Sequence, residues 1–220
     1  MKMCRMIGFS FNSQADVSDL FRQIKTMAKH GKHSPHQDGW GLYLLCQEGV
    51  IYYRTATGVQ DEQIPHLEAF AGLMHVRKAS EGLPITFLQA QPFIDNNGKA
   101  FCHNGTIHDI PLCSIKSDSY SLFRKIRNFQ SHAELLDILR TLDEYNYTSL
   151  NFLLMDSTNL IAYCAYRKNP SYYTLWYSTT KGIVVSSEPL SADFQPMQLM
   201  ENHSLLIARE GELIEHFTIG

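Results

Sequence analysis

The sequence of 220 residues has few charges and no long apolar run. Charged residues make up 19%, and no stretch approaches the ~20 apolar residues that a membrane-spanning helix needs. Lysine and arginine are scattered and the formal net charge is −3, so the basic patch typical of nucleic-acid-binding proteins is missing. The start of the chain also lacks the apolar core of a signal peptide. We expect a cytoplasmic protein that binds neither nucleic acid nor membrane.

Cysteine is scarce as well, with five residues: Cys4, Cys46, Cys102, Cys113 and Cys164. The number is odd and no CxxC pair occurs, which argues against a disulfide framework and a zinc site and favours reduced thiols. His30, His33 and His36 lie in and beside one polar loop, where a metal site is one reading. Solvated side chains are the favoured reading, because no partner ligand stands at metal spacing beside them.

What the sequence does contain is typical of one folded domain over residues 1–220, with 44% apolar residues. Apolar periodicity predicts helices at 13–30, 61–71, 117–129 and 131–143, and strands at 42–46, 50–54, 73–77 and 100–102. Six more strands are predicted at 149–156, 160–167, 172–178, 182–187, 204–209 and 212–219. This order indicates an α+β fold in which two antiparallel sheets pack face to face and helices cover the outside.

Cys4 stands directly before an apolar, strand-like run at the start of the chain. Cysteine is the strongest ordinary nucleophile near neutral pH, and a chain that began at Cys4 would carry its own base. An α-amine has a pKa near ~8 and can accept the thiol proton. Residues 1–3 must first be removed, either because translation starts at Met3 and that Met is trimmed, or as a short propeptide. The alternative is a buried strand cysteine.

Three other places carry polar groups beside predicted strands or helices. Arg77 closes an apolar strand, where a guanidinium needs a carboxylate from the protein or from a ligand. Asn104 and Gly105 end another strand; they form an ordinary turn, or supply the two donors of an oxyanion hole. Asp118 and Ser119 open a helix, for which both are ordinary N-cap residues.

Taken in this order, the features resemble the class II glutamine amidotransferases, which belong to the N-terminal-nucleophile hydrolase superfamily. The resemblance is carried by residues 3–8, 36–41, 75–82, 101–105, 117–119 and 185–189. It implies a four-layer αββα sandwich that hydrolyses a γ-glutamyl amide and needs no metal and no organic cofactor.

The resemblance also implies roles for individual residues. Cys4 would be the nucleophile, Asn104 and Gly105 the oxyanion hole, Arg77 the partner of the substrate α-carboxylate and Asp118 that of its α-ammonium, with Ser80 and His103 as further substrate-binding residues. One cationic and one anionic partner at a fixed separation suit a zwitterionic amino-acid head. The chain departs from the family pattern at residues 1 and 2 and at Lys78, where larger members carry tryptophan.

Residues 36–41 look most like a stand-alone group related to γ-glutamyl hydrolases. Because the chain ends at Gly220, soon after the last predicted strand, we expect that it either hydrolyses its substrate or passes ammonia to a separate synthase subunit; a homo-oligomer is also open. One alternative is a catalytically silent member that acts as a binding or regulatory subunit. Another is a hydrolase with a Cys102–His103 pair, which is disfavoured because neighbours in a strand point to opposite faces.

Overall fold

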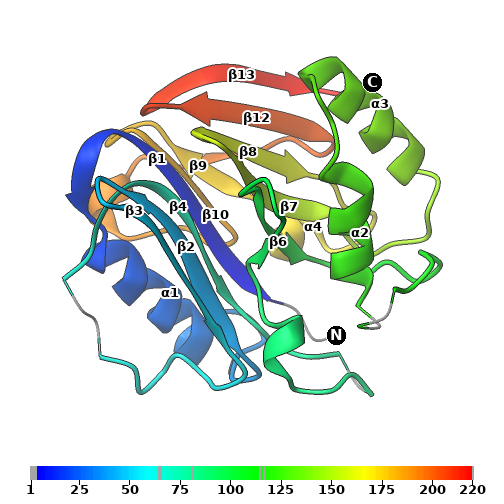
Figure 1. The fold of residues 1–220 in the computed structure, drawn as a ribbon, viewed down its shortest axis with the longest axis horizontal. Helices are drawn as coiled ribbons and strands as arrows, with labels where there is room; N and C mark the ends of the chain where they lie inside the picture. The colour runs from blue at the N-terminus through cyan, green and yellow to red at the C-terminus, as the bar shows by residue number, and fades with distance from the viewer. Residues whose placement is uncertain (1–3, 64–65, 81, 114, 116, 220) are drawn as a thin grey trace.

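Two antiparallel sheets stack face to face between outer helices, as the four layers in Figure 1 show. The structure is a computed structural model and describes residues 4–63, 66–80, 82–113, 115 and 117–219. Helix α1 (Ser18–His30) covers one sheet, and helices α2 (Asp118–Ile126) and α3 (His132–Leu142) cover the other. The αββα sandwich expected from the sequence is confirmed.

The first sheet has seven strands in the order β11-β9-β10-β1-β4-β2-β3. They are β1 (Arg5–Asp16), β2 (Trp40–Cys46), β3 (Gly49–Thr55), β4 (Glu68–Val76), β9 (Trp176–Ser178), β10 (Ile183–Ser186) and β11 (Gln198–Leu199). The second sheet has six strands in the order β13-β12-β8-β7-β6-β5. They are β5 (Phe93–Ile94), β6 (Ala100–Asn104), β7 (Asn151–Asp156), β8 (Asn159–Cys164), β12 (Ser204–Arg209) and β13 (Glu212–Thr218).

Strand β1 lies at the centre of the first sheet and shows how alternation builds the layers. Ile7 and Phe9 pack against α1, whereas Met6 points into the core between the sheets. Gly8 keeps the sheets close, because a Cβ at this position would lie 2.8 Å from Leu160 Cδ1. Among the described helices the longest, α1, has 13 residues, and none is long and apolar enough to cross a membrane.

Two predicted elements differ from the structure. Residues 61–63 and 66–71, the described part of the helix predicted at 61–71, form no helix; instead β4 begins at Glu68 and pairs with both β1 and β2. Residues 69 and 71–76 are buried on both faces of this strand, a pattern that periodicity cannot distinguish from a short helix. The strand predicted at 172–178 starts instead as helix α4 (Pro170–Tyr173), because proline is favoured in the first turn of a helix.

The boundaries of α1 also differ from the prediction. The helix begins at Ser18 rather than at residue 13, because β1 continues to Asp16 and pairs with β4 there. Asp16 Oδ1 accepts a hydrogen bond of 2.8 Å from the backbone N–H of Ser18, which marks the change from strand to helix. The helix ends before Gly31, as predicted.

Candidate active site

A small cavity at the start of β1 collects residues that lie far apart in the sequence. Five of the seven predicted site residues line it: Cys4, Arg77, Ser80, Gly105 and Asp118. The other lining residues are Lys78, Ala79, Leu83, Gln89, Gln91, Ser117 and Ser119. Cys4 and Arg77 adjoin strands of the first sheet, whereas Gly105 and Asp118 follow β6 and open α2, so the cavity lies where both sheets meet.

Arg5 fixes the backbone that carries Cys4. The buried guanidinium donates to the carbonyl oxygens of Cys4 (3.2 Å) and Lys32 (2.7 Å), and its Nε lies 2.6 Å from Glu188 Oε1. It also lies 4.1 Å from the centroid of the Tyr172 ring, a cation–π contact. The family-like segment 185–189 therefore holds the start of β1 in place.

Residue Cys4 is partly exposed as a whole, but its thiol is buried, and the surroundings of the thiol act on its pKa in opposite directions. Burial raises the pKa of Cys4, whereas a hydrogen bond from the Lys78 backbone and the positive charge of Arg77 lower it. The net pKa lies above the ordinary value of a thiol. Cys4 is therefore protonated at neutral pH and needs a base before it can attack.

Arg77 directly follows β4 and is almost completely buried. Its guanidinium donates to Asp38 O (3.2 Å) and to Gln89 Oε1 (2.6 Å), and Pro84 O lies at 3.4 Å. The ion pairs of the described arginines involve other residues, so no described carboxylate pairs with Arg77. Burial lowers the pKa of Arg77. A buried cation without a protein carboxylate is suited to an anionic ligand.

The family-like loop 36–41 holds the Arg77 segment. Arg77 N donates to Gly39 O (2.7 Å), Asp38 N donates to Arg77 O (3.1 Å), and the Asp38 carboxylate accepts from Ala79 N (2.8 Å). Gly39 has φ +133, which other residues rarely adopt, and a Cβ on Gly41 would lie 2.5 Å from Gln91 O. The two glycines thus let the loop lie against the backbone of Thr55 and Gln91, while its hydrogen bonds hold the Arg77 segment.

Asp118 is the first residue of α2 and is free of the capping role that the sequence suggested. The N-cap is Ser117, whose hydroxyl accepts from Tyr120 N at 3.3 Å. Asp118 Oδ2 accepts from Ile107 N (2.9 Å) and Oδ1 from Ser119 N (2.8 Å). A carboxylate offers about four acceptor positions, so Asp118 keeps capacity for a cationic group in the cavity.

Asn104 ends β6 and is completely buried. Neither its carboxamide nitrogen nor its oxygen has a hydrogen-bond partner among the described residues, which is rare for a buried amide. Asn104 shares a face of β6 with Cys102, which packs in the core between the sheets. Its side chain therefore lies on the face of β6 that is turned to the first sheet, whose strand β1 begins directly after Cys4, although Asn104 is not among the residues that line the Cys4 cavity.

Gly105 has no room for a side chain. A Cβ there would lie 1.9 Å from Ser149 O, far inside contact distance. The backbone of Gly105 thus lies against Ser149 on one side and lines the cavity on the other. The Gly105 N–H and the Asn104 carboxamide are hydrogen-bond donors on adjacent residues. A pair of such donors can stabilise the negative charge that develops on an oxyanion.

His103 does not line the cavity, so it would not touch a substrate bound there. Alternation in β6 turns its ring towards α2, where Nδ1 lies 2.8 Å from Ser119 Oγ and Nε2 lies 3.2 Å from Ser149 O. It supports Ser119, which does line the cavity. The same alternation separates His103 from Cys102 and rules out the Cys102–His103 catalytic pair.

The three histidines of the first loop do not come together as a metal site. His36 is completely buried, which corrects the expectation of a solvated side chain, whereas His30 and His33 are exposed. The His33 ring lies 4.8 Å from that of Tyr172. Within the described ranges, no cluster of three or more histidine, cysteine, aspartate or glutamate side chains is arranged to hold a metal ion.

A fourth histidine, His75, lies completely buried on β4, opposite Met6 on the face turned to the second sheet. Burial disfavours the imidazolium and lowers the pKa of His75 to about 3, against a smaller opposing effect of the His103 backbone. Unfolding restores an ordinary pKa of about 6.5. The native state therefore gains stability from neutral His75 above pH 6.5 and loses it as the pH falls from 6.5 towards 3.

We expect His75 to destabilise the protein in mild acid. Between pH 7 and pH 5 it lowers the free energy of unfolding by about 2 kcal/mol, because the unfolded chain takes up the proton that the native state refuses. Urea unfolding at both pH values measures this loss in the wild type and in His75→Gln, which should lack it. His30→Gln is the control, since His30 is exposed and its replacement should keep the wild-type loss. An equal loss in His75→Gln would disprove the assignment.

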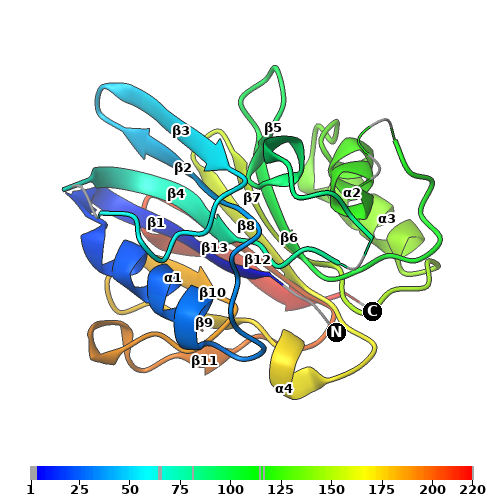
Figure 2. The ribbon, with the colours of Figure 1, turned by 90° about the horizontal axis from the view of Figure 1, so that it is seen from below.

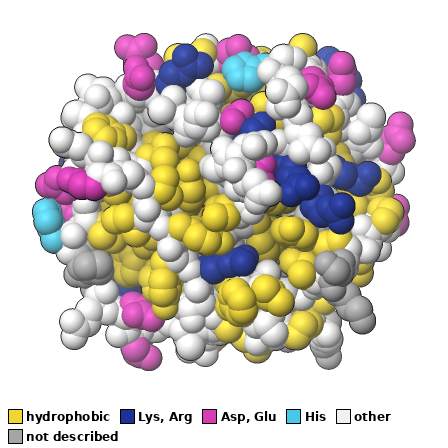
Figure 3. Space-filling view, in the orientation of Figure 1, with side chains coloured by type: hydrophobic (Ala, Val, Ile, Leu, Met, Phe, Trp, Pro, Cys, Tyr) yellow, Lys and Arg dark blue, Asp and Glu magenta, His cyan; other side chains and the backbone are white. Residues whose placement is uncertain are grey.

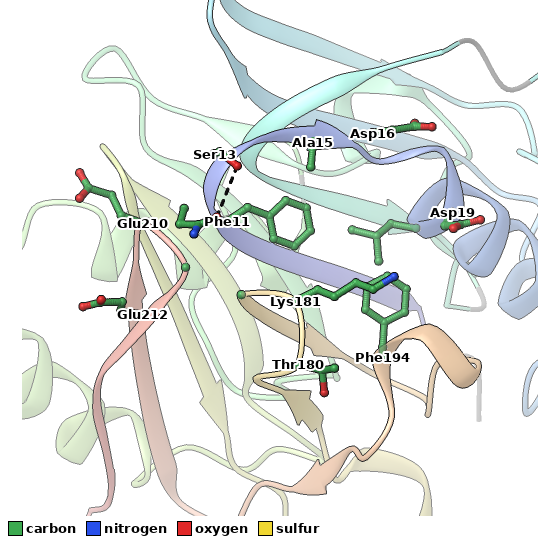
Figure 4. Close-up of a pocket in the computed structure, with 14 residues that line it drawn as sticks. Phe11, Ser13, Ala15, Asp16, Asp19, Thr180, Lys181, Phe194, Glu210 and Glu212 are labelled. Carbon is green, nitrogen blue, oxygen red and sulfur yellow. Dashed lines mark hydrogen bonds between the residues drawn. The ribbon is translucent and has the colours of Figure 1, made fainter.

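Larger cavities than the one at Cys4 lie elsewhere on the molecule. A cavity of about 440 Å³ lies at the other end of β1, where Figure 4 shows Asp16, Asp19, Lys181, Glu210 and Glu212 around its rim. Its lining contains no cysteine, arginine or histidine. Because it offers neither a thiol nor a guanidinium, the chemistry points to the smaller cavity at Cys4.

Sequence reasoning missed two glutamines in the Cys4 cavity. Gln89 Oε1 accepts from Arg77, and its Nε2 donates to Ile115 O (2.9 Å). Gln91 Oε1 accepts from the backbone N–H of His103 (2.6 Å). Both residues are buried although they follow an irregular segment. No periodic pattern marks such positions, so the sequence carries no signal for them.

Three solved structures share this fold with the chain. A predicted glutamine amidotransferase from Pseudomonas aeruginosa is 19% identical, with 96% of this chain and all of that chain covered and a TM-score of 0.63. A class-II domain protein from Silicibacter pomeroyi is 15% identical, with 99% and 100% covered and a TM-score of 0.68. Glutamine phosphoribosylpyrophosphate amidotransferase from B. subtilis is 17% identical, with 99% of this chain but 49% of that chain covered and a TM-score of 0.66.

These structures share the fold of the N-terminal-nucleophile hydrolases with this chain, and identities below 20% show nothing more. No curated protein matches the sequence. The family description "Glutamine amidotransferases class-II", however, matches residues 3–180, which is most of the chain and includes every predicted site residue. The chain therefore belongs to the class II glutamine amidotransferase family.

Proposed function

We propose that the protein hydrolyses a γ-glutamyl amide, either glutamine or another γ-glutamyl compound, through a thioester on Cys4. The observation that carries this proposal is the composition of one cavity. It combines a thiol, a buried guanidinium without a protein carboxylate and a carboxylate with free acceptor capacity. A thiol supplies the nucleophile, and the two opposite charges fit the head of an α-amino acid.

In the proposed reaction the Cys4 sulfur attacks the side-chain carbonyl carbon of the glutamyl group. The carbonyl oxygen becomes an oxyanion, which the Asn104 carboxamide and the Gly105 N–H stabilise. The C–N bond then breaks, and the leaving amine takes the proton that came from the thiol. Water attacks the resulting thioester, which releases glutamate and restores the thiol.

The remaining residues would bind the substrate head. Arg77 would pair with the α-carboxylate, close to the Ser80 hydroxyl, and Asp118 would accept from the α-ammonium. His103 would act indirectly, by positioning Ser119. Gln89 also lines the cavity, and because its amide oxygen already accepts from Arg77, the α-carboxylate would replace that contact.

The proposed base is the α-amine of Cys4, which exists only once residues 1–3 have been removed. These residues lie outside the described part of the chain. The α-amine and the sulfur would belong to the same residue, so the base would lie in direct reach of the thiol. A cytoplasmic location is part of the proposal, and all five cysteines are free thiols, as is usual there.

Two measurements on the purified protein test the function. Intact mass gives the first residue, and glutamate release is followed for glutamine and a small panel of γ-glutamyl compounds. A chain that starts at Cys4 and releases glutamate supports the proposal. A chain that keeps Met1 and releases none would fit the silent binding or regulatory subunit instead. Glutamate release that rises only when a separate synthase is added would indicate an ammonia-supplying subunit.

Arg77→Ala should weaken substrate binding more than it slows turnover. The guanidinium would hold the α-carboxylate equally in the ground and transition states, and hydrogen bonds to charged groups contribute about 1.5–3 kcal/mol. We expect KM for the preferred γ-glutamyl substrate to rise by about 10- to 100-fold, with kcat changed far less. Steady-state kinetics measure the split, and Arg127→Ala is the control, since Arg127 lies outside the cavity. An equal fall of kcat and kcat/KM would contradict a ground-state role.

A further inference from the structure

Strand β3 forms a free edge of the first sheet. Among the described strands it pairs only with β2, in an unbroken register from Trp40–Thr55 to Cys46–Gly49, and it lies at one edge of its sheet in Figure 2. Val50, Ile51 and Tyr53 are 54%, 40% and 46% exposed. A regular edge of seven residues presents a row of unpaired backbone groups to solvent.

The other three edges are protected in ways that β3 is not. Strands β5 and β11 have two residues each, too short to act as a template. Strand β13 has a register shift against β12 and carries Glu212, Glu215 and His216. Strand β3 has no register shift and no proline, and Arg54 is its one charged residue. Edges of this kind are covered by another chain or aggregate.

The apolar surface continues beyond the strand. Arg54 donates to Ala90 O (3.2 Å), and its guanidinium lies 5.4 Å from the Phe87 ring. Phe87 is 56% exposed, so this contact joins it to the end of β3. Figure 3 shows hydrophobic side chains gathered over a broad area of this face, where β3 lies in Figure 1. An apolar area next to an open edge is typical of an interaction surface.

We propose that β3 pairs with β3 of a second copy of this chain, antiparallel and about a twofold axis at Ile51. Backbone groups point outward at every second residue of an edge strand. Counted from the Cys46–Gly49 pair that closes the two-residue turn, these residues are Val50, Tyr52 and Arg54. With Ile51 on the axis, Val50 of one copy faces Tyr52 of the other, so the outward groups of both strands meet.

The charges favour a second copy over an unrelated protein. In this register Glu48, which is exposed in the turn before β3, lies opposite Arg54 of the second copy. The twofold axis repeats the pair, so the negative end of each strand meets the positive end of the other. The two Ile51 side chains face each other in a non-hydrogen-bonded pair, where side chains approach most closely. The β3 edges of two copies are therefore complementary in hydrogen bonding, charge and apolar contact.

The oligomeric state in solution tests the pairing. Light scattering at about 50 µM should give the wild type a mass of 50.4 kDa, twice the 25.2 kDa of one chain. Ile51→Lys places two like charges on the axis and should give 25.2 kDa. Leu112→Lys is the control, because Leu112 is 57% exposed and lies outside β3, and it should remain a dimer. A monomeric wild type, or a dimeric Ile51→Lys protein, would overturn the proposal.

Cross-linking tests the register. Mild oxidation of Ile51→Cys should join most of the protein into a reducible dimer, because the two sulfur atoms meet on the axis. Val50→Cys and the wild type should stay uncross-linked, since Val50 faces Tyr52 of the second copy and the native thiols lie off the axis. Near-equal cross-linking of Val50→Cys and Ile51→Cys, or none with Ile51→Cys, would refute the register. The circular dichroism of each variant confirms that it is folded.

Discussion

Cys4→Ala should abolish the release of glutamate, with kcat lowered by at least ~10⁴-fold, the scale on which enzymes lose activity when their nucleophile is removed. The variant keeps the rest of the cavity, and binding of a γ-glutamyl substrate should persist within a few-fold. The reason is that Cys4 would contribute the atom that forms the thioester, whereas Arg77 and Asp118 would hold the substrate head. Glutamate release and isothermal titration with glutamine measure the two effects separately.

Cys113→Ala is the matched control for this loss. Cys113 is, like Cys4, a partly exposed residue with a free thiol, but it lies outside the cavity, and its replacement should leave the turnover number unchanged. The diazoketone 6-diazo-5-oxo-norleucine, a glutamine mimic that alkylates thiols with loss of N₂, should label Cys4 and none of the other four. Activity that survives in Cys4→Ala, or a label on another cysteine, would refute the nucleophile assignment.

The layered fold could be predicted from the sequence because amphipathic segments report which face is buried. Helix α1 carries one apolar face, and its end at Gly31 follows from a residue without a side chain. Strand β4 escaped this reasoning, since a strand in the middle of a sheet is buried on both faces and loses the period of two. Its pairing with β1 and β2 comes from contacts far along the chain, which no local pattern records.

The sequence likewise located some residues of the candidate site and misplaced or missed others. Arg77 and Gly105 directly follow strands, and Asp118 opens a helix, so the ends of predicted elements located them. His103 and Asn104 were both expected to face substrate. The period of two makes this impossible for neighbours in one strand, and β6 continues to Asn104, two residues beyond the predicted end. Gln89 and Gln91 lie near an irregular turn, where position in space depends on the whole fold.

The surroundings of the cavity determine the charge state of its thiol and leave its guanidinium without a carboxylate partner. A thiol beside two arginines alone would have a lowered pKa, and Asp118 alone would raise it. Burial exceeds both effects and keeps Cys4 protonated, while the cost of burying Arg77 is met by carbonyl and amide oxygens rather than by a carboxylate. The cavity therefore keeps its thiol neutral and its guanidinium available until a base and an anionic ligand are present.

Asn104→Ala should lower kcat by about 10²- to 10³-fold, as the loss of one oxyanion donor does in other enzymes, with little change in KM. It should scarcely affect the melting temperature. Asn104 has no hydrogen-bond partner among the described residues, so alanine removes an unpaired buried amide without breaking a bond. A loss of activity without a loss of stability is the expected result for a side chain that makes no contribution to folding. Steady-state kinetics and thermal unfolding measure the two effects.

Asn151→Ala is the matched control, because Asn151 lies opposite Asn104 in the register and is equally buried. Its carboxamide donates to Tyr173 O and accepts from Ala165 N at 2.8 Å. Removing it leaves both groups unpaired, at a cost of about 1–3 kcal/mol, and should lower the melting temperature by roughly 2–10 °C. The kcat of the folded fraction should stay within about tenfold of the wild-type value. This change is much smaller than the fall in kcat expected when one oxyanion donor is lost. If Asn104→Ala lost stability as Asn151→Ala does and kept its kcat, Asn104 would be a structural residue and the oxyanion would need another donor.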